Sequence, residues 1–299
     1  MGHDHSHGNS EKNLKLAFFI NFGFTIIEII GGFLTNSVAI ISDALHDMGD
    51  SLSLGLAWYI EGKANKKGAT NDFSFGYARF RLLGALINSV VLIAGSIYII
   101  YEAISRLQNP EAVDSKYMIG FAILGVLANG YAAWRVSGGK SLNDKVVSWH
   151  LLEDVLGWVA VLIVAIILQF KDWYILDPIL SLGITLYILW GVGGRLKDTL
   201  HLLLQGVPEG LDMQEVKRQL QQVDHVNSIH HMHVWSLDGE HHVLTAHLVL
   251  ENITHYDQID DVRQSAIESV ADWDFSHHTF QLELDRRKCP LPSQDQEDL

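Results

Sequence analysis

Two stretches of the chain carry a histidine followed four residues later by an aspartate: His46 with Asp50, and His150 with Asp154. Residues four apart lie on one face of an α-helix, so each stretch can present an imidazole and a carboxylate side by side. Two such helices packed face to face would bring two nitrogen and two oxygen ligands to one point. This donor set predicts a tetrahedral site for Zn²⁺ or a closely related divalent cation.

Both stretches lie within long apolar segments, and this location bears on what such a site would do. Ionisable side chains are costly at membrane depth, and those that occur there generally mark ion pathways. We therefore interpret the four residues as a transport site rather than as separate polar bridges between helices. Asp43, three residues before His46, is expected to line the access path or to support the ligands, whereas Asp47 and Glu153 point elsewhere on their helices.

Six apolar segments precede residue 206, and each is long enough to cross a membrane. The polar residues within them, such as Asn21, Thr25 and Glu28, are expected to face the interior of a helix bundle. Lys and Arg are most frequent before the first segment and after the second, fourth and sixth, which predicts that both termini are cytoplasmic. The expected spans are 14–35, 38–60, 79–101, 117–134, 146–170 and 175–192.

The remainder of the 299-residue chain is polar and acidic. Residues 206–299 contain 18 Asp and Glu but 6 Lys and Arg, and so account for 12 of the 14 net negative charges. Nucleic-acid binding needs a basic surface and is not expected. The single Cys289 excludes an intrachain disulfide and a cysteine-based zinc finger. The N-terminal sequence does not have the pattern of a cleaved signal peptide.

We expect four parts: a histidine-containing tail at 1–13, a six-helix transmembrane domain at 14–205, a soluble domain at 206–290 and a disordered end at 291–299. The tail contains His3, His5 and His7. Such a tract could collect metal ions or have no role, and its composition leaves both open.

The soluble domain has the pattern of a helix, two strands, a helix and a third strand. Asp212 followed by Glu215 is typical of a helix N-terminus, and Asp238-Gly239 between two β-like runs indicates a hairpin. With both helices on one face of a small sheet, this order predicts a ferredoxin-like α+β (αββαβ) fold. The expected elements are a helix at 212–223, strands at 226–237 and 241–250, a helix at 256–273 and a strand at 277–285.

The chain resembles the cation diffusion facilitators, in the branch of bacterial zinc and cadmium exporters. The resemblance covers nearly the whole chain and implies six membrane helices with both ends cytoplasmic. It further implies a homodimeric antiporter that exports Zn²⁺ across the bacterial inner membrane in exchange for protons. The motifs that carry it are Ser42-Asp43-Ala44-Leu45-His46 with Asp50, Phe75-Gly76-Tyr77-Ala78-Arg79, His150 with Asp154, Asp177-Pro178-Ile179-Leu180-Ser181 and His231-Met232-His233-Val234-Trp235.

A second metal site is expected in the soluble domain, although the residues alone leave its arrangement open. A two-residue loop at Asp238-Gly239 would pair His247 with His230 and place His233 on the opposite face of the sheet. A three-residue loop with Gly239 in a left-handed conformation and a bulge would place His233 and His247 on one face.

The resemblance implies the second arrangement, with Glu283 as a further ligand and His278 as a candidate fourth. It also locates one difference from the family. Relatives often have a metal site in the loop after the second helix, but Phe73 and Tyr77 occupy ligand positions here and leave Asp72 alone. No metal site is expected in that loop.

We predict a transporter and not an enzyme, because the chain has no HExxH, phosphate-binding or GxSxG pattern. Zn²⁺ would be the exported substrate and a structural or regulatory ligand of the soluble domain, with Cd²⁺, Co²⁺ and Fe²⁺ as other candidate substrates. The partners would be protons, a second copy of the chain and the lipid bilayer. The alternative is a membrane-bound metal sensor that binds without translocation.

Overall fold

The computed structural model describes residues 7–64, 69–137 and 142–284. The chain divides into two compact units, Met1–Lys197 and Asp198–Leu299, and each is described by itself. His3 and His5, and the end at 291–299 that we expect to be disordered, lie outside the described residues.

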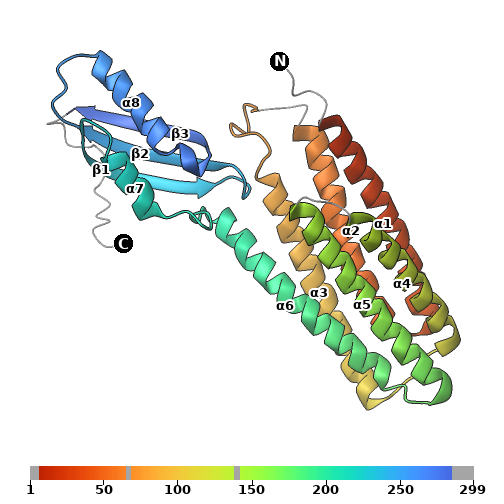
Figure 1. Cartoon of the computed structure of the whole chain (residues 1–299). Helices are drawn as coiled ribbons and strands as arrows, with labels where there is room; N and C mark the ends of the chain where they lie inside the picture. Colours follow the sequence, from red (N-terminus) through yellow and green to blue (C-terminus); the bar gives the residue numbers. More distant parts are fainter. Residues whose placement is uncertain (1–6, 65–68, 138–141, 285–299) are drawn as a thin grey trace. The chain divides into compact units, whose positions relative to one another are not determined.

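The first unit consists of long helices, as the apolar segments predict. The first helix begins at His7, earlier than expected. Among the described residues, five helices are long and apolar enough to cross a membrane; the second is not among them, and it carries Asp43, Asp47 and Asp50 within its apolar sequence. The helices are α1 (His7–Thr35), α2 (Val38–Ala64), α3 (Phe80–Gln108), α4 (Ser115–Ser137), α5 (Leu142–Phe170) and α6 (Leu176–Leu203) (Figure 1).

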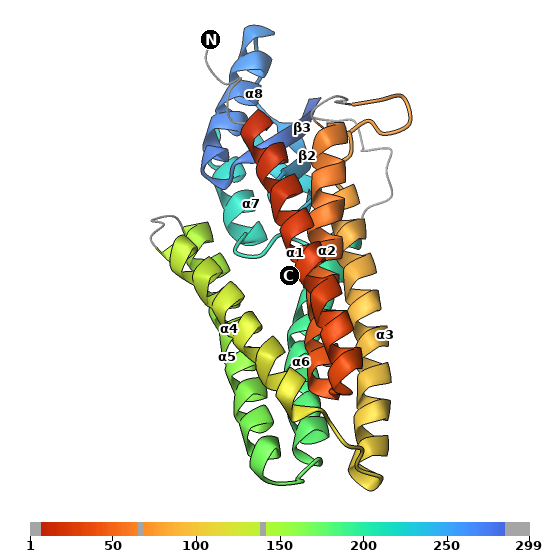
Figure 2. The ribbon, with the colours of Figure 1, turned by 90° about the vertical axis from the view of Figure 1, so that its right-hand side faces the viewer.

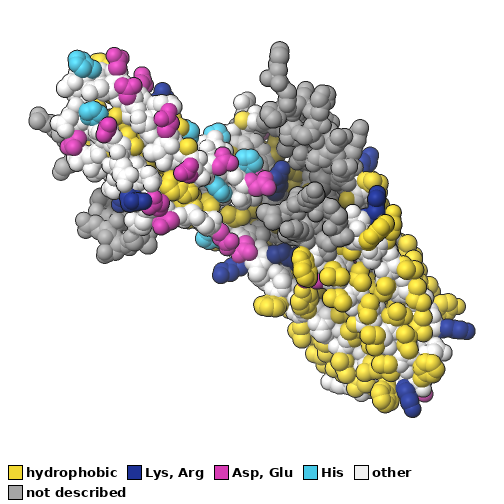
Figure 3. Space-filling view, viewed as in Figure 1, with side chains coloured by type: hydrophobic (Ala, Val, Ile, Leu, Met, Phe, Trp, Pro, Cys, Tyr) yellow, Lys and Arg dark blue, Asp and Glu magenta, His cyan; other side chains and the backbone are white. Residues whose placement is uncertain are grey.

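The surface of these helices is strongly apolar. Figure 3 shows yellow hydrophobic side chains covering the helical part, with Lys and Arg near its ends. Large side chains such as Phe33, Trp134 and Trp190 are 73%, 71% and 81% exposed, which would be unfavourable in water. This surface is that of a protein whose helices are surrounded by lipid.

The helices pack as neighbouring pairs. α1 runs beside α2 and α4 runs beside α5, while α3 packs on the other side of α2 (Figure 2). The α4–α5 pair meets α2 through a buried cluster that includes Ile40, Met118 and Trp158. Gly125 makes the α4–α5 contact possible, because a Cβ atom there would overlap the indole ring of Trp158. In Figure 2 this pair diverges from α1 and α2 toward the end at which α5 begins.

The second unit contains a mixed three-stranded sheet in the order β1-β2-β3, with β1 antiparallel and β3 parallel to β2. Residues from both helices and from one face of the sheet form its core, among them Val216, Leu220, Leu244, Leu248 and Val262. The element order is the expected αββαβ: α7 (Met213–Gln221), β1 (Val226–Ser236), β2 (His242–Leu250), α8 (Asp257–Ser269), η1 (Ala271–Trp273) and β3 (Phe275–Leu284).

Local sequence signals account for the start of α7. Asp212 caps this helix, because its carboxylate accepts a hydrogen bond of 2.9 Å from the backbone N–H of Gln214. Glu215 does not complete a capping box. Its carboxylate instead accepts from Arg218 at 2.6 and 2.8 Å, and these bonds hold the pKa of Glu215 below its ordinary value.

The hairpin between β1 and β2 has the three-residue loop of our second alternative. Leu237 donates its N–H to the carbonyl of His241 at 2.8 Å, and Gly239 has a φ of +99° in the loop between them. Burial alone would raise the pKa of Asp238, but hydrogen bonds from the backbone N–H groups of His241 and Glu240 and from the His241 side chain together lower that pKa.

Candidate functional site

One face of α2 presents the first predicted pair of ligands. His46 and Asp50 are separated by one helical turn, with His46 Nε2 and Asp50 Oδ2 3.8 Å apart. Their side chains are 12% and 23% exposed, so both are largely removed from solvent. α5 provides the second pair. Asp154 is half-buried on α5, and the side chain of His150 lies outside the described part of that helix.

A cavity of about 550 Å³ lies between α2 and α5, the two helices that carry the predicted ligands. It is lined by His46 and Asp43 from α2, by Asp154 and Glu153 from α5, and by residues of α6. Asp43 therefore lies beside the proposed ligands, as expected of a residue on the access path. Glu153 also reaches the cavity, where it accepts a hydrogen bond of 2.9 Å from the Tyr187 hydroxyl of α6.

Two of the predicted ligands, His46 of α2 and Asp154 of α5, line this cavity. Among the residues whose side chains the structure describes, the groups of three His, Asp or Glu whose ligand atoms lie within 4.8 Å of one another belong to the C-terminal unit. His46 lies in the α2 wall and Asp154 in the α5 wall, and Asp50 follows His46 by one turn of α2. Carboxylates and an imidazole around a cavity can bind a divalent cation after a small movement of either wall.

α1 contributes a buried acid that the motif analysis did not assign to the site. Glu28 is 1% exposed, and both of its carboxylate oxygens are buried. Asp43 and Asp47 of α2 and Asp154 of α5 are close enough to interact with Glu28 electrostatically. Several acids in one poorly solvated region favour the binding of cations or protons there.

The sequence contained a signal for this acidic region. Asn21, Thr25 and Glu28 are spaced by four and three residues on α1, the spacing of one helix face. That face packs on α2: Asn21 donates to the carbonyl of Asp47 at 3.1 Å and to the Ser51 hydroxyl at 2.9 Å. The prediction that these polar residues face the bundle interior is confirmed for Thr25 and Glu28, which are both buried.

The second cluster lies on the face of the sheet that the helices do not cover. Glu283 of β3 accepts from His247 Nδ1 of β2 at 2.9 Å, and its other oxygen lies 3.3 Å from His230 Nε2 of β1. One ligand atom from each of these residues lies within 4.8 Å of the other two. Two imidazoles and a carboxylate are a common donor set for Zn²⁺.

A β-bulge determines which histidine of β1 joins this cluster. His233 pairs with Thr245 and His230 pairs with His247, so β1 has one residue more than β2 between these pairs. His231 occupies the bulge, with a φ of +49°. An extra residue reverses the side on which later residues point, and His230 therefore comes to the same face as His233.

The structure thus brings His247 and Glu283 together, as predicted, but adds His230 to them. His233 lies on the same face beside Thr245, outside this group. His278 pairs with Leu244, whose side chain is in the core, so His278 belongs to the opposite face of the sheet. We therefore leave His278 out of the candidate site.

The remaining predicted feature is the loop after α2. The rings of Phe73, Tyr77 and Phe80 pack against one another there, with centroids 5.2–5.4 Å apart. The side chains of Phe73 and Tyr77 therefore belong to an aromatic cluster in this loop.

Patterns of known families match almost the whole chain. The cation efflux transmembrane domain matches residues 14–204, and the cytoplasmic domain of cation efflux proteins matches residues 208–279.

Several characterised proteins are similar over nearly their full length. The cadmium, cobalt and zinc/H⁺–K⁺ antiporter of Bacillus subtilis is 35% identical over 289 residues, which are 95% of this chain and 93% of that protein. The metal cation efflux system protein CzcD of Cupriavidus metallidurans is 37% identical over 287 residues (95% and 90%). The zinc transporter ZitB of Escherichia coli is 33% identical over 295 residues (95% and 93%).

Among solved structures, the metal-bound C-terminal domain of the CzcD transporter from Cupriavidus metallidurans is 31% identical. The match covers 25% of this chain and 100% of that domain, with a TM-score of 0.23.

Proposed function

The chain belongs to the cation efflux family, and we propose that it exports Zn²⁺ from the cytoplasm in exchange for protons. The observation that carries this proposal is the cavity lined by His46 of α2 and Asp154 of α5. Relatives that are at least 33% identical are named as transporters of zinc, cadmium and cobalt, and two of them are named as antiporters. Cd²⁺, Co²⁺ and Fe²⁺ are further candidate substrates.

The transport site in this proposal consists of His46, Asp50, His150 and Asp154. His150 precedes Asp154 by four residues in the sequence of α5, which is the spacing of one helix face. Closure of α5 toward α2 would surround the ion with two nitrogen and two oxygen ligands. Asp43 would guide the ion along the wall of the cavity.

Competition between metal and protons provides the coupling. Zn²⁺ binds neutral imidazoles and ionised carboxylates, so protons that reach His46, His150 or the aspartates displace it. Each pH unit across the membrane is worth about 1.4 kcal/mol per exchanged proton. A proton gradient can therefore drive the release of an ion that the closed site binds tightly.

We further propose that α2 is a sixth membrane span and that its aspartates face the bundle rather than lipid. Asp43 and Asp47 are each 8% exposed, which supports this placement. The distribution of Lys and Arg supports cytoplasmic termini, and we assign the protein to the bacterial inner membrane. The αββαβ order and the mixed sheet support a ferredoxin-like fold for the cytoplasmic domain.

In the cytoplasmic domain we propose a regulatory Zn²⁺ site formed by His230, His247 and Glu283. Two acidic domains would repel each other in a homodimer, and bound Zn²⁺ would neutralise part of this charge. The domain would then associate more closely with that of the partner when cytoplasmic zinc is high. Such coupling requires that Zn²⁺ binds one arrangement of the two domains more tightly than the other.

Zinc flux into proteoliposomes under an imposed pH gradient tests the transport function. We expect the wild type to move Zn²⁺ only when a proton gradient can drive it, and Asp50→Ala or Asp154→Ala to abolish the flux. Asp172→Ala is a matched control, because this exposed carboxylate lies in a loop away from the cavity. Zinc binding without flux in the wild type would instead indicate a sensor.

A further inference from the structure

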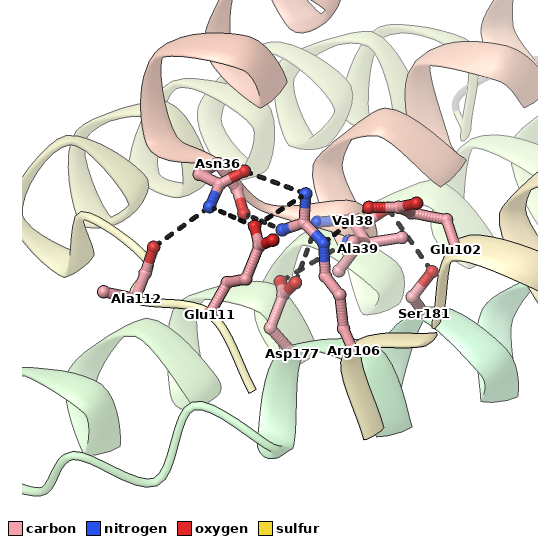
Figure 4. Close-up of polar contacts among 9 residues, drawn as sticks. All are labelled: Asn36, Val38, Ala39, Glu102, Arg106, Glu111, Ala112, Asp177 and Ser181. Atoms are coloured by element: carbon pink, nitrogen blue, oxygen red, sulfur yellow. Dashed lines mark hydrogen bonds and ion pairs between the residues drawn. The ribbon is translucent and has the colours of Figure 1, made fainter. Parts of the chain in front are cut away.

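Asp177 stands in the first turn of α6 but bonds to the start of another helix. Its carboxylate is buried and accepts hydrogen bonds from the Ser37 hydroxyl (2.5 Å) and from the backbone N–H groups of Val38 (2.8 Å) and Ala39 (3.4 Å). The first N–H groups of a helix lack partners within it, and a negative charge is favourable beside them. Asp177 of α6 therefore caps α2 (Figure 4).

Two more residues of α6 continue this contact at intervals of four residues. Ser181 donates to the carbonyl of Val38 at 3.3 Å, and Thr185 shares a hydrogen bond of 2.8 Å with Ser42. All of the side chains involved are at most 2% exposed. We refer to this contact as the α2–α6 polar stripe; it comprises Ser37, Val38, Ser42, Asp177, Ser181 and Thr185.

The turn before α2 is hydrogen-bonded to α3, close to the α2 end that Asp177 caps. Arg106 of α3 donates to the carbonyl of Asn36 at 2.6 Å and to its side-chain oxygen at 2.8 Å, while Glu102 accepts from Arg106 at 2.8 Å (Figure 4). Asn36 has a φ of +56°, which turns the chain sharply from α1 into α2. The start of α2 is thus held against both α3 and α6.

The polar stripe ends one helical turn before the proposed transport ligand His46. Ser42, Thr185 and His46 line one small cavity, so the stripe reaches the neighbourhood of the ligand. A slide of α2 along α6 by the rise of one residue would move His46 by about 1.5 Å. Metal ligands must be held within about 0.5 Å of their productive position, so the stripe bears directly on ion binding.

We propose that Asp177 is a positioning residue for transport, and that it keeps α2 and α6 together as one body while the cavity opens and closes. The proposal rests on the transport function described above. His46 and Asp50 then stay fixed relative to α6, and α5 with Asp154 moves against them. Asp177 itself binds neither the ion nor the transported proton.

A removable cross-link between α2 and α6 tests this proposal in the full chain. The substitutions Ser42→Cys and Thr185→Cys place two thiols where hydroxyl oxygens lie 2.8 Å apart, in a Cys289→Ser background. The disulfide is formed by oxidation and opened by reduction in the same sample. Zn²⁺ alone is the probe, and both equilibrium binding and flux into proteoliposomes are measured.

We expect the cross-linked protein to retain flux within about twofold of its reduced form. Loss of flux on oxidation, with recovery on reduction, would show that α2 slides along α6 and would overturn the proposal. Asp177→Ala in the same background should lower zinc affinity and flux at least tenfold when reduced, and oxidation should restore most of both. An Asp177→Ala protein that stays equally impaired after cross-linking would overturn the proposal, because the loss would then not come from movement between α2 and α6.

A second variant and a separate binding measurement cover the cases in which Asp177→Ala does not fold or the parent protein does not transport zinc. If Asp177→Ala does not fold, Ser181→Ala weakens the same stripe without exposing the cap, and its smaller loss of affinity should also be reversed by the cross-link. If the parent protein binds Zn²⁺ but moves none, the transport function fails, whereas the effect of Asp177 on binding still tests positioning. An unaltered zinc affinity in both variants would overturn the proposal.

Discussion

His230→Ala should abolish most zinc binding by the C-terminal domain, whereas His233→Ala should not. Both residues lie on β1 and on the same uncovered face of the sheet. The ligand atom of His230 is within 4.8 Å of those of His247 and Glu283, and that of His233 is not in this group. The two substitutions remove the same side chain from the same strand, so each controls for the other.

The expected magnitude follows from the number of ligands. Loss of an outer partner of a metal ligand typically costs about 10–100-fold in affinity. Removal of one of three ligands should cost at least the upper end of this range, about 100-fold, which corresponds to about 2.7 kcal/mol. At a zinc concentration of about 100 times the wild-type Kd, zinc stabilises the wild-type domain by about 2.7 kcal/mol and the variant by only about 0.4 kcal/mol.

Hydrogen exchange of the full chain, with and without zinc, measures this difference locally. Asp154→Ala is included in every sample to weaken the transport site. Zinc should slow exchange in the core strand β2 about 100-fold in the parent and in His233→Ala, but only about twofold in His230→Ala. Equal protection in His230→Ala and the parent, together with its loss in His233→Ala, would refute the assignment made from the bulge.

Three further predictions concern other parts of the molecule. His46→Asp should preserve a divalent site but change the ratio of Zn²⁺ to Cd²⁺ flux, because ligand type contributes to selectivity; an unchanged ratio would place selection elsewhere. The lowered pKa of Asp238 means that folding favours its ionised form. The contribution of Asp238 to the free energy of unfolding is therefore present above pH of about 4 and is lost as the pH falls. Asp238→Asn should flatten this part of a profile of stability against pH measured by denaturant unfolding. Trp158 is 1% exposed, and Trp158→Ala should destabilise the helical unit by about 3–5 kcal/mol in thermal unfolding, whereas substitution of the exposed Trp190 should have little effect.

Sequence patterns alone determined the elements of this protein and most of the chemistry of the proposed transport site. The apolar segments predicted the helices of the first unit, and the four-residue spacing placed His46 with Asp50 on one face of α2. Asp238-Gly239 predicted the hairpin between β1 and β2. These features depend on residues close together in the sequence, where backbone geometry alone dictates which side chains are neighbours.

Features that depend on distant segments were decided by the tertiary structure. Alternation along β1 did not reveal the bulge that brings His230 beside His247 and Glu283, because register is set by pairing with β2. Asp177 lies at the start of the sixth apolar segment in the sequence, but its carboxylate caps α2, about 140 residues earlier. The unpaired N–H groups at a helix N-terminus can donate to any suitably placed acceptor. Only the packing of α6 on α2 determines that Asp177 is that acceptor.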